Sequence, residues 1–280
     1  MTNAASAVAN KPAWVDLGTT DTAAASRFYS TLFGWDVRVN PDPQYGGYGR
    51  AVLDGKDVAG IGPTMSPEQP VAWSVYIGTD DAQALGGKVE AAGGHILAPA
   101  FDVGDQGRMA VFADPGGAAI SVWQPIAMGG FQTQGANAFS WAELNARNVG
   151  ASLPFYRDVF GWALHASDSP EMPYTEFQVE GTSIAGATEM SPMAPAEMPN
   201  YWLVYFGVDD VDASTVTAVK AGGKEMLAPM DFPGGRLSMS VLSADCRAGR
   251  SAFASIAMAF TASNARPSPN TALRSRNATS

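Results

Sequence analysis

Residues 14–35, WVDLGTTDTAAASRFYSTLFGW, recur in residues 141–162 as WAELNARNVGASLPFYRDVFGW, at an offset of 127 residues. Trp14 matches Trp141, Asp16 matches Glu143, and the FY and FGW stretches keep their spacing. Further matches follow in the same order: Tyr48 with Tyr174, Ala59-Gly60 with Ala185-Gly186, and Trp73-x-x-Tyr76 with Trp202-x-x-Tyr205. An ordered series of this kind indicates an internal duplication and predicts two homologous domains.

Each copy is expected to begin with a strand followed by a helix. Apolar residues at positions 25, 28, 29, 32 and 33 recur at spacings of three and four, which is typical of one helical face. Asp21 stands where its carboxylate can cap that helix. A weaker repeat lies inside each half, since Trp14 precedes Asp21 by seven residues and Trp73 precedes Asp80 by seven. Short alternating segments such as 49–53 and 109–113 follow. The sequence therefore predicts four units, each a strand, a helix and about three strands.

These units predict a first domain over residues 12–125, a flexible linker over 126–137 that is rich in glycine and glutamine, and a second domain over 138–245. The first copy closes with DPGGA at 114–118, whereas the second reads DCRAGRSAF from Asp245, so we expect its closing strand to be altered. Residues 246–280 carry five arginines and no acid, and we expect a disordered tail. A shifted reading frame near 243–246 and a natural divergent extension both explain this change.

Composition excludes several classes of function. The net charge of −10 argues against a nucleic-acid partner, because phosphate binding needs a basic surface. One cysteine excludes a disulfide framework, and two histidines leave little for a metal centre. No apolar run is long enough to span a membrane, and the first ten residues lack the pattern of a signal peptide. We therefore expect a cytoplasmic protein, a monomer or homodimer, with a small molecule as its partner.

The segments W-x-D-L at 14–17, FYxxLFGW at 28–35 and DPGGA at 114–118 resemble the vicinal oxygen chelate superfamily of glyoxalases, bleomycin resistance proteins and extradiol dioxygenases. The resemblance covers residues 12–243. It implies an α+β fold of two tandem domains, each a pair of βαβββ units whose curled mixed sheets form a cup.

The resemblance also implies where metal ligands would stand. In metal-using members, a histidine usually stands seven residues before the aspartate that follows the first strand of each unit, and a glutamate follows the DPxG turn. The histidine positions hold Trp14, Trp73, Trp141 and Trp202, and the glutamate position holds Ser121. An indole has no lone pair for a metal. We therefore expect no metal and no cofactor.

If Trp14 occupies a ligand position, it faces the cup, and Asp16 two residues later on the strand faces the same way. Trp141 and Glu143 repeat this pair. We predict ligand-binding roles for Trp14, Tyr48, Trp73, Trp141, Tyr174 and Trp202, because aromatic walls with few polar groups suit a flat organic molecule. Asp16 and Glu143 are the candidate catalytic residues, since a carboxyl group in such walls can act as an acid or base. The structural alternatives are core packing for the tryptophans and pairing of the carboxylates with Arg27, Arg50 or Arg147.

Three functions follow from these residues. The first is a metal-independent binding or resistance protein that holds a small aromatic or polycyclic molecule in an aromatic cup. The second is an enzyme of secondary metabolism, a hydroxylase, lyase or isomerase, that uses Asp16 or Glu143 as acid or base. The third is a metal-dependent glyoxalase or dioxygenase.

Overall fold

The computed structural model describes residues 9–67, 69–168, 173–192, 194–232 and 235–242, and the backbone of 256–262. The first half of the chain contains the expected pair of units. Its elements are β1 (Pro12–Thr19), α2 (Thr22–Phe33), β2 (Asp36–Val39), the 3-10 turn η1 (Pro43–Tyr45), β3 (Gly49–Leu53), β4 (Lys56–Pro63), β5 (Ala72–Gly78), α3 (Ala82–Ala91), β6 (His95–Val103), β7 (Gly107–Ala113) and β8 (Ala119–Pro125).

The second half repeats this order. Its elements are β9 (Phe139–Ala146), α4 (Val149–Phe160), β10 (Ala163–Ala166), β11 (Tyr174–Val179), β12 (Thr182–Glu189), β13 (Tyr201–Gly207), α5 (Val211–Lys220), β14 (Gly223–Phe232), β15 (Gly235–Leu242) and β16 (Ile256–Ala262). The prediction of an α+β fold with four βαβββ units is confirmed.

Strand β16 corrects the predicted end of the second domain. It lies inside the segment expected to be a tail, pairs parallel with β13 and antiparallel with β15, and takes the place that β8 has in the first sheet. The apolar run at 256–260 satisfies two strand edges that would otherwise be left unpaired, although no DPxG turn precedes it. Residues 243–255 and 263–280, on which the reading-frame hypothesis and the rest of the predicted tail depend, lie outside the described residues.

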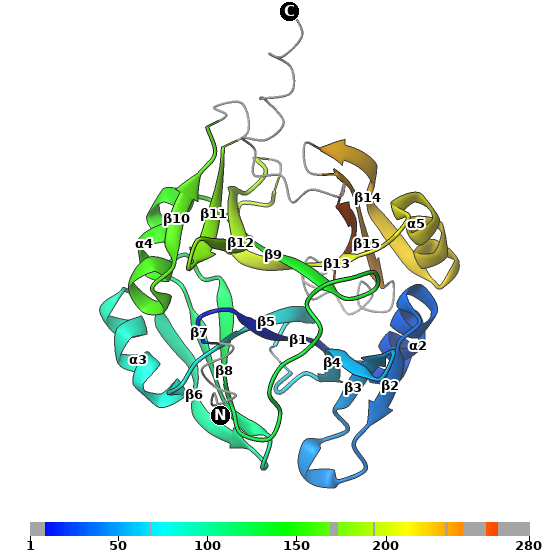
Figure 1. Ribbon diagram of the computed structural model, residues 1–280, viewed down its shortest axis with the longest axis horizontal. Coiled ribbons are helices and arrows are strands. Elements are labelled where there is room, and N and C mark those ends of the chain that lie inside the picture. Colours follow the sequence, from blue (N-terminus) through cyan, green and yellow to red (C-terminus); the bar gives the residue numbers. More distant parts are fainter. Residues whose placement is uncertain are drawn as a thin grey trace, which may run out of the picture.

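Each domain forms one eight-stranded mixed sheet, with strand orders β2-β3-β4-β1-β5-β8-β7-β6 and β10-β11-β12-β9-β13-β16-β15-β14. The two units of a domain meet where β1 pairs antiparallel with β5, and where β9 pairs with β13. In Figure 1 the two sheets lie one above the other and curl away from each other, with α2 beside α5 on one flank and α3 beside α4 on the other. The concave faces therefore open in opposite directions. None of the described helices has the length and apolar character needed to cross a lipid bilayer.

Helix α2 begins and ends where the sequence predicted. The Asp21 carboxylate accepts a hydrogen bond of 2.8 Å from the Ala24 backbone N–H, and Gly34 ends the helix in the left-handed region at φ 71°. Asn148 and Gly161 do the same for α4. The aromatic pairs of the FY motif are buried in the core, as expected from their helical spacing.

The two domains share one hydrophobic core and a reciprocal pair of hydrogen bonds. The Trp35 indole donates to the Asn137 carbonyl at 2.7 Å, and the Trp162 indole donates to the Asn10 carbonyl at 2.7 Å. Both asparagines have left-handed backbone, with φ of 60° and 61°, and each stands two residues before the first strand of its own half of the chain. The FGW motif of each domain is therefore a contact with the other domain, which gives the duplication a packing role.

Candidate functional site

Cup 1, the concave face of the first sheet, contains a hydrogen-bonded network around Asp16. The Trp14 indole donates to the Tyr48 hydroxyl at 2.8 Å, and Tyr48 donates to Asp16 Oδ2 at 3.0 Å. Tyr76 on β5 donates to the same oxygen at 2.9 Å. Trp14 and Asp16 face the cup together because they lie two residues apart on β1. Three of the predicted site residues, Trp14, Asp16 and Tyr48, are thus brought together.

Burial moves the pKa of the Asp16 carboxyl group towards the neutral range. Burial raises the pKa of this carboxyl from an ordinary 3.8 to about 6, although hydrogen bonds from Tyr76, Tyr48 and Ser74 lower it in part. Burial and the neighbouring Asp16 charge raise the pKa of Tyr48 and of Tyr76 well above the ordinary value. Both phenols therefore remain donors throughout the physiological range.

Cup 2, the concave face of the second sheet, repeats the network around Glu143. The Trp141 indole donates to the Tyr174 hydroxyl at 2.9 Å, Tyr174 hydrogen-bonds the Glu143 carboxylate, and Tyr205 donates to Glu143 Oε1 at 2.9 Å. Asn145 adds a longer bond of 3.3 Å. Burial raises the pKa of Glu143 as well, against these donors. The structure therefore brings Trp141, Glu143 and Tyr174, three of the predicted site residues, into one cluster.

A glycine in each sheet makes room for the tyrosine of the network. A methyl carbon at Gly60 would lie 2.5 Å from Tyr48 Cζ and 2.9 Å from Asp16 Cβ. A methyl carbon at Gly186 would lie 2.6 Å from Tyr174 Cε1. The repeated Ala-Gly pairs at 59–60 and 185–186 are explained by this close approach of an aromatic ring to the strand.

The ion pairs considered for the carboxylates do not form with Arg50 or Arg147. Arg50 pairs with Asp57 at 2.8 Å, and Arg147 donates to the Met198 carbonyl at 3.1 Å. The partners of Asp16 and Glu143 are phenols instead, and no cation among the described residues pairs with either carboxyl group.

The predicted ligand-binding roles of Trp73 and Trp202 are wrong. Both side chains point to the opposite face of their sheets and are buried in the shared core. The Trp73 indole donates to the Tyr29 hydroxyl at 3.0 Å, and the Trp202 indole donates to Tyr156 at 3.0 Å. These tryptophans pack against the helices, so their role is structural.

The error has a simple origin, a shift of one residue. The helix α3 is capped by Asp81, not by Asp80, and Thr79 contacts the Asp81 backbone N–H as Thr19 contacts that of Asp21. Counting seven residues back from Asp81 reaches Ser74, whose strand partner is Asp16. A shift of one residue on a strand reverses the face of every side chain.

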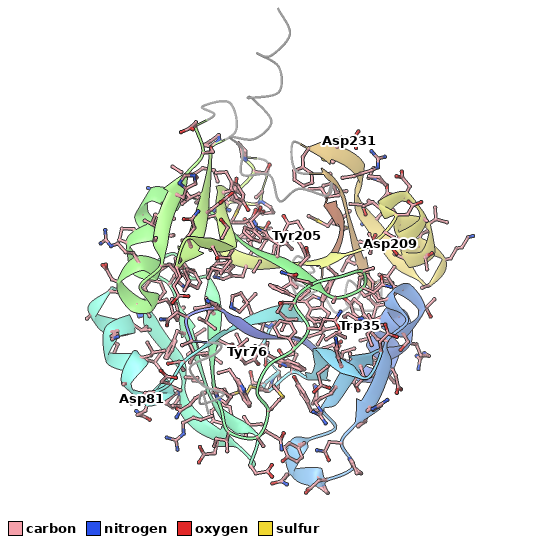
Figure 2. The ribbon with its side chains drawn as sticks, in the orientation of Figure 1. Trp35, Tyr76, Asp81, Tyr205, Asp209 and Asp231 are labelled. Carbon is pink, nitrogen blue, oxygen red and sulfur yellow. The ribbon has the colours of Figure 1, made fainter. Side chains whose placement is uncertain are left out.

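The same correction identifies Tyr76 and Tyr205, which the sequence analysis did not assign to the site. Figure 2 shows them on the two different sheets, and each donates to the carboxylate of its own cup. The signal was available in the repeated W-x-x-Y motif and in the T-x-D caps. In cup 2 the position equivalent to Ser74 is Leu203, which packs with Tyr205.

The donors in either cup do not fit a metal centre of the kind that the fold family uses. Ser74 and Leu203 replace two of the tryptophans at the expected ligand positions, and Trp14 and Trp141 remain at the other two. The carboxylate at the centre of each network has phenol and indole groups as its neighbours, and the further carboxylate on the cup 2 face, Glu176, accepts a hydrogen bond from the Ser183 hydroxyl. Within the described part of the chain, no group of three His, Cys, Asp or Glu side chains is close enough to hold a metal ion. His95 and His165 are exposed on the edge strands β6 and β10.

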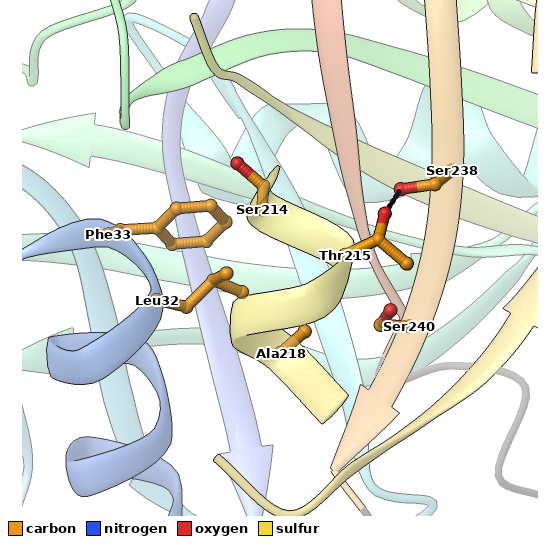
Figure 3. Close-up of a pocket in the computed structure, with 7 residues that line it drawn as sticks. All are labelled: Leu32, Phe33, Ser214, Thr215, Ala218, Ser238 and Ser240. Carbon is orange, nitrogen blue, oxygen red and sulfur yellow. Dashed lines mark hydrogen bonds between the residues drawn. The ribbon is translucent and has the colours of Figure 1, made fainter. Parts of the chain in front are cut away.

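A small cavity between α2, α5 and β15 is not a candidate for an organic ligand. Its volume is about 10 Å³, and Thr215 donates to Ser238 at 2.7 Å on its wall (Figure 3). The buried Ser240 hydroxyl has no hydrogen-bond partner among the described residues. A space of this size with polar walls suits a single water molecule.

Two known proteins are similar to this chain in sequence over most of its length. The chain is 40% identical over 228 residues to "Putative glyoxylase CFP32" of Mycobacterium tuberculosis, which covers 79% of this chain and 86% of the relative. It is 39% identical over 240 residues to the anthracycline biosynthesis protein DnrV of Streptomyces peucetius, with coverage of 80% and 86%.

Solved structures agree at the level of the fold. The Mn(II)-bound glyoxalase of Novosphingobium aromaticivorans matches with a TM-score of 0.57 and 16% identity over 90% of this chain and 82% of that one. The 2,2',3-trihydroxybiphenyl 1,2-dioxygenase of Sphingomonas wittichii matches with a TM-score of 0.59 and 13% identity over 90% of each chain. The model of the Glyoxalase/Bleomycin resistance protein/Dioxygenase superfamily matches residues 11–122 and 138–242. The chain belongs to this superfamily.

Proposed function

We propose that the protein binds a small aromatic or polycyclic molecule in an aromatic cup, without a metal, as a binding or resistance protein. The observation that carries this proposal is the network itself, in which an indole and two phenols surround a carboxyl group that pairs with no cation among the described residues, on the concave face of a sheet. The aromatic rings supply flat apolar contact area, and the carboxyl group accepts a hydrogen bond from a ligand hydroxyl. In this proposal the protein works in the cytoplasm as a monomer or homodimer.

The relatives support a ligand of this class. DnrV and DauV are named as anthracycline biosynthesis proteins, and anthracyclines are built on fused aromatic rings. Hydroxylated fused-ring compounds such as alizarin, and 2-naphthol as a smaller analogue, match both the aromatic walls and the acceptor. Saturable quenching of tryptophan fluorescence by either compound is the expected result. A folded protein that shows no saturable change with either would contradict the proposal.

The second candidate is an enzyme of secondary metabolism that uses Asp16 or Glu143 as acid or base. Burial, which raises the pKa of the Asp16 carboxyl to about 6, favours it, because an acid–base group works best with a pKa near the working pH. Asp16→Asn and Glu143→Gln separate the two candidates. An enzyme loses turnover in one of these variants and keeps its affinity, whereas a binding protein shows no turnover in any form.

A metal-dependent glyoxalase or dioxygenase is the third candidate, and the donor set opposes it. Zinc sites use about four nitrogen, oxygen or sulfur ligands, and the carboxylate at the centre of each network is surrounded by aromatic groups. Metal analysis of the purified protein is the test. Stoichiometric zinc, iron or manganese would overturn the proposal of metal independence.

A further inference from the structure

Cup 1 is crossed by the segment that joins the two domains, residues 126–137, which we call the strap. We expected a flexible linker here, but the structure anchors it at two points. The backbone N–H groups of Ile126, Ala127 and Met128 all lie within 3.0–3.1 Å of the Gln106 carbonyl. Further along, the Gln132 N–H donates to the Asp57 carbonyl at 2.9 Å. The strap thus runs from the turn before β7 to the start of β4, and Figure 1 shows it passing over the first sheet.

Between these anchors the strap places apolar side chains against the walls of cup 1. The Phe131 ring packs edge-on against the Trp14 indole, with centroids 5.5 Å apart and an interplanar angle of 64°. Met128 packs into the same cluster, and its carbonyl accepts a hydrogen bond of 3.1 Å from the Trp123 indole. These two side chains and those of Tyr76, Met109 and Trp123 enclose Trp14, which is only 2% exposed.

Cup 2 has no such cover among the described residues. No aromatic ring of the described side chains packs against Trp141, and Trp141 stays partly exposed although its network matches that of Trp14. Leu203 and Tyr205 form the buried floor, while Tyr201, Leu237 and Met239 are only partly buried around it. This wall is apolar and aromatic, with the Glu143 carboxyl group as its acceptor.

We infer that the strap occupies cup 1 as an internal ligand, so that each chain takes a single aromatic molecule, in cup 2, with one ring set edge-on against Trp141 as Phe131 is set against Trp14. The duplication carries this inference, because two copies of one network present equivalent surfaces and the occupant of the first shows what fits the second. A hydroxylated aromatic ring contacts Trp141 and donates to Glu143. The inference rests on the proposed function for the ligand of cup 2.

Equilibrium dialysis with 2-naphthol against the full chain tests the number and place of the sites. The wild-type chain is expected to bind one molecule. Trp141→Ala is expected to lose at least tenfold in affinity, and the double variant Phe131→Ala with Met128→Ala is expected to bind two molecules. Phe131→Leu is the matched control, since leucine keeps an apolar side chain against Trp14 and should leave one site.

Two bound molecules per wild-type chain would overturn the inference but leave the proposed function standing. The same holds if the wild-type chain binds one molecule and this binding is lost in Trp14→Ala but kept in Trp141→Ala. Absence of binding in every form contradicts the proposed function instead. In that event the strap is tested without a ligand, by fluorine NMR of protein labelled with 5-fluorotryptophan. Phe131→Ala should shift the Trp14 resonance and increase its H2O/D2O isotope shift, while Trp141 should not change. An unmoved Trp14 resonance would show that the strap does not fill cup 1.

Discussion

Cup 1 and cup 2 contain the same network but differ in enclosure. In each, an indole donates to a tyrosine hydroxyl and a second tyrosine donates to one carboxylate, at 2.8 to 2.9 Å. The first tyrosine also hydrogen-bonds that carboxylate. In cup 1 the strap covers the indole, whereas Trp141 in cup 2 remains partly exposed. The network therefore belongs to the sheet, and a segment outside the repeat encloses the indole of cup 1.

The largest expected difference between the cups is in stability. Trp14→Ala removes a buried side chain with neighbours on all sides and should lower the free energy of unfolding by about 3–5 kcal/mol. Trp141→Ala should lower it by about 1–2 kcal/mol, since a partly exposed side chain gives up less apolar area. Urea denaturation followed by circular dichroism measures both. Equal losses would mean that the two indoles are enclosed alike and that the comparison fails.

A smaller effect is expected from adding one methyl group beneath each tyrosine. Gly60→Ala and Gly186→Ala should each lower the free energy of unfolding by about 1–3 kcal/mol, because the ring of Tyr48 or Tyr174 has to move away from the strand. Gly87→Ala is the control, because a methyl carbon at that position meets no neighbour within 4 Å. Gly55→Ala is unsuitable, because Gly55 has a positive φ that alanine adopts only with strain.

The two substitutions should differ in their effect on the ligand. Displacing Tyr174 disturbs the open cup and should weaken 2-naphthol binding severalfold, while displacing Tyr48 beneath the strap should leave binding unchanged. Fluorescence titration of both variants measures this. Weaker binding in Gly60→Ala alone would place the ligand in cup 1 and contradict our inference.

The last expected effect is a pH dependence caused by Asp16. With a folded pKa of about 6 and an ordinary value of 3.8, the folded protein binds more protons than the unfolded chain between these two values. The contribution of Asp16 to the free energy of unfolding therefore falls as the pH rises from about 4 to about 6, and it stays low above that range.

Asp16→Asn removes this contribution, so the variant should gain stability relative to the wild type across the same range. Urea denaturation at pH 4, 5, 6 and 7.5 measures the difference. Glu143→Gln should change in the same direction, because burial raises the pKa of Glu143 too. A difference between variant and wild type that does not vary with pH would contradict the protonation argument.

Much of this organisation follows from local sequence. Asp21 and Gly34 bound a helix through backbone chemistry that needs no partner segment, and the same positions recur as Asn148 and Gly161. The carboxylate two residues after each tryptophan faces the same way on a strand, so Trp14 with Asp16 and Trp141 with Glu143 were predictable as pairs.

Other features could not be read this way. The side of the sheet on which Trp73 lies could be predicted only by knowing whether Asp80 or Asp81 caps α3. A shift of one residue along β5 moves a side chain from the cup to the core. Strand β16 lacks the turn sequence of its counterpart and is defined by the two strands that it pairs with. Phe131 lies in a glycine-rich stretch without periodicity, where nothing local indicates a partner 117 residues earlier in the chain.

The sequence by itself determined the duplication, the four units and the pairing of an indole with a carboxyl group in each half, because these follow from repeated spacing and from the alternation of side chains along a strand. Only the tertiary structure decided which tryptophans face a cup, which segment closes the second sheet and which cup the strap fills. These depend on contacts between distant segments, where the burial of apolar surface and the satisfaction of strand edges select one arrangement from several that the local sequence allows.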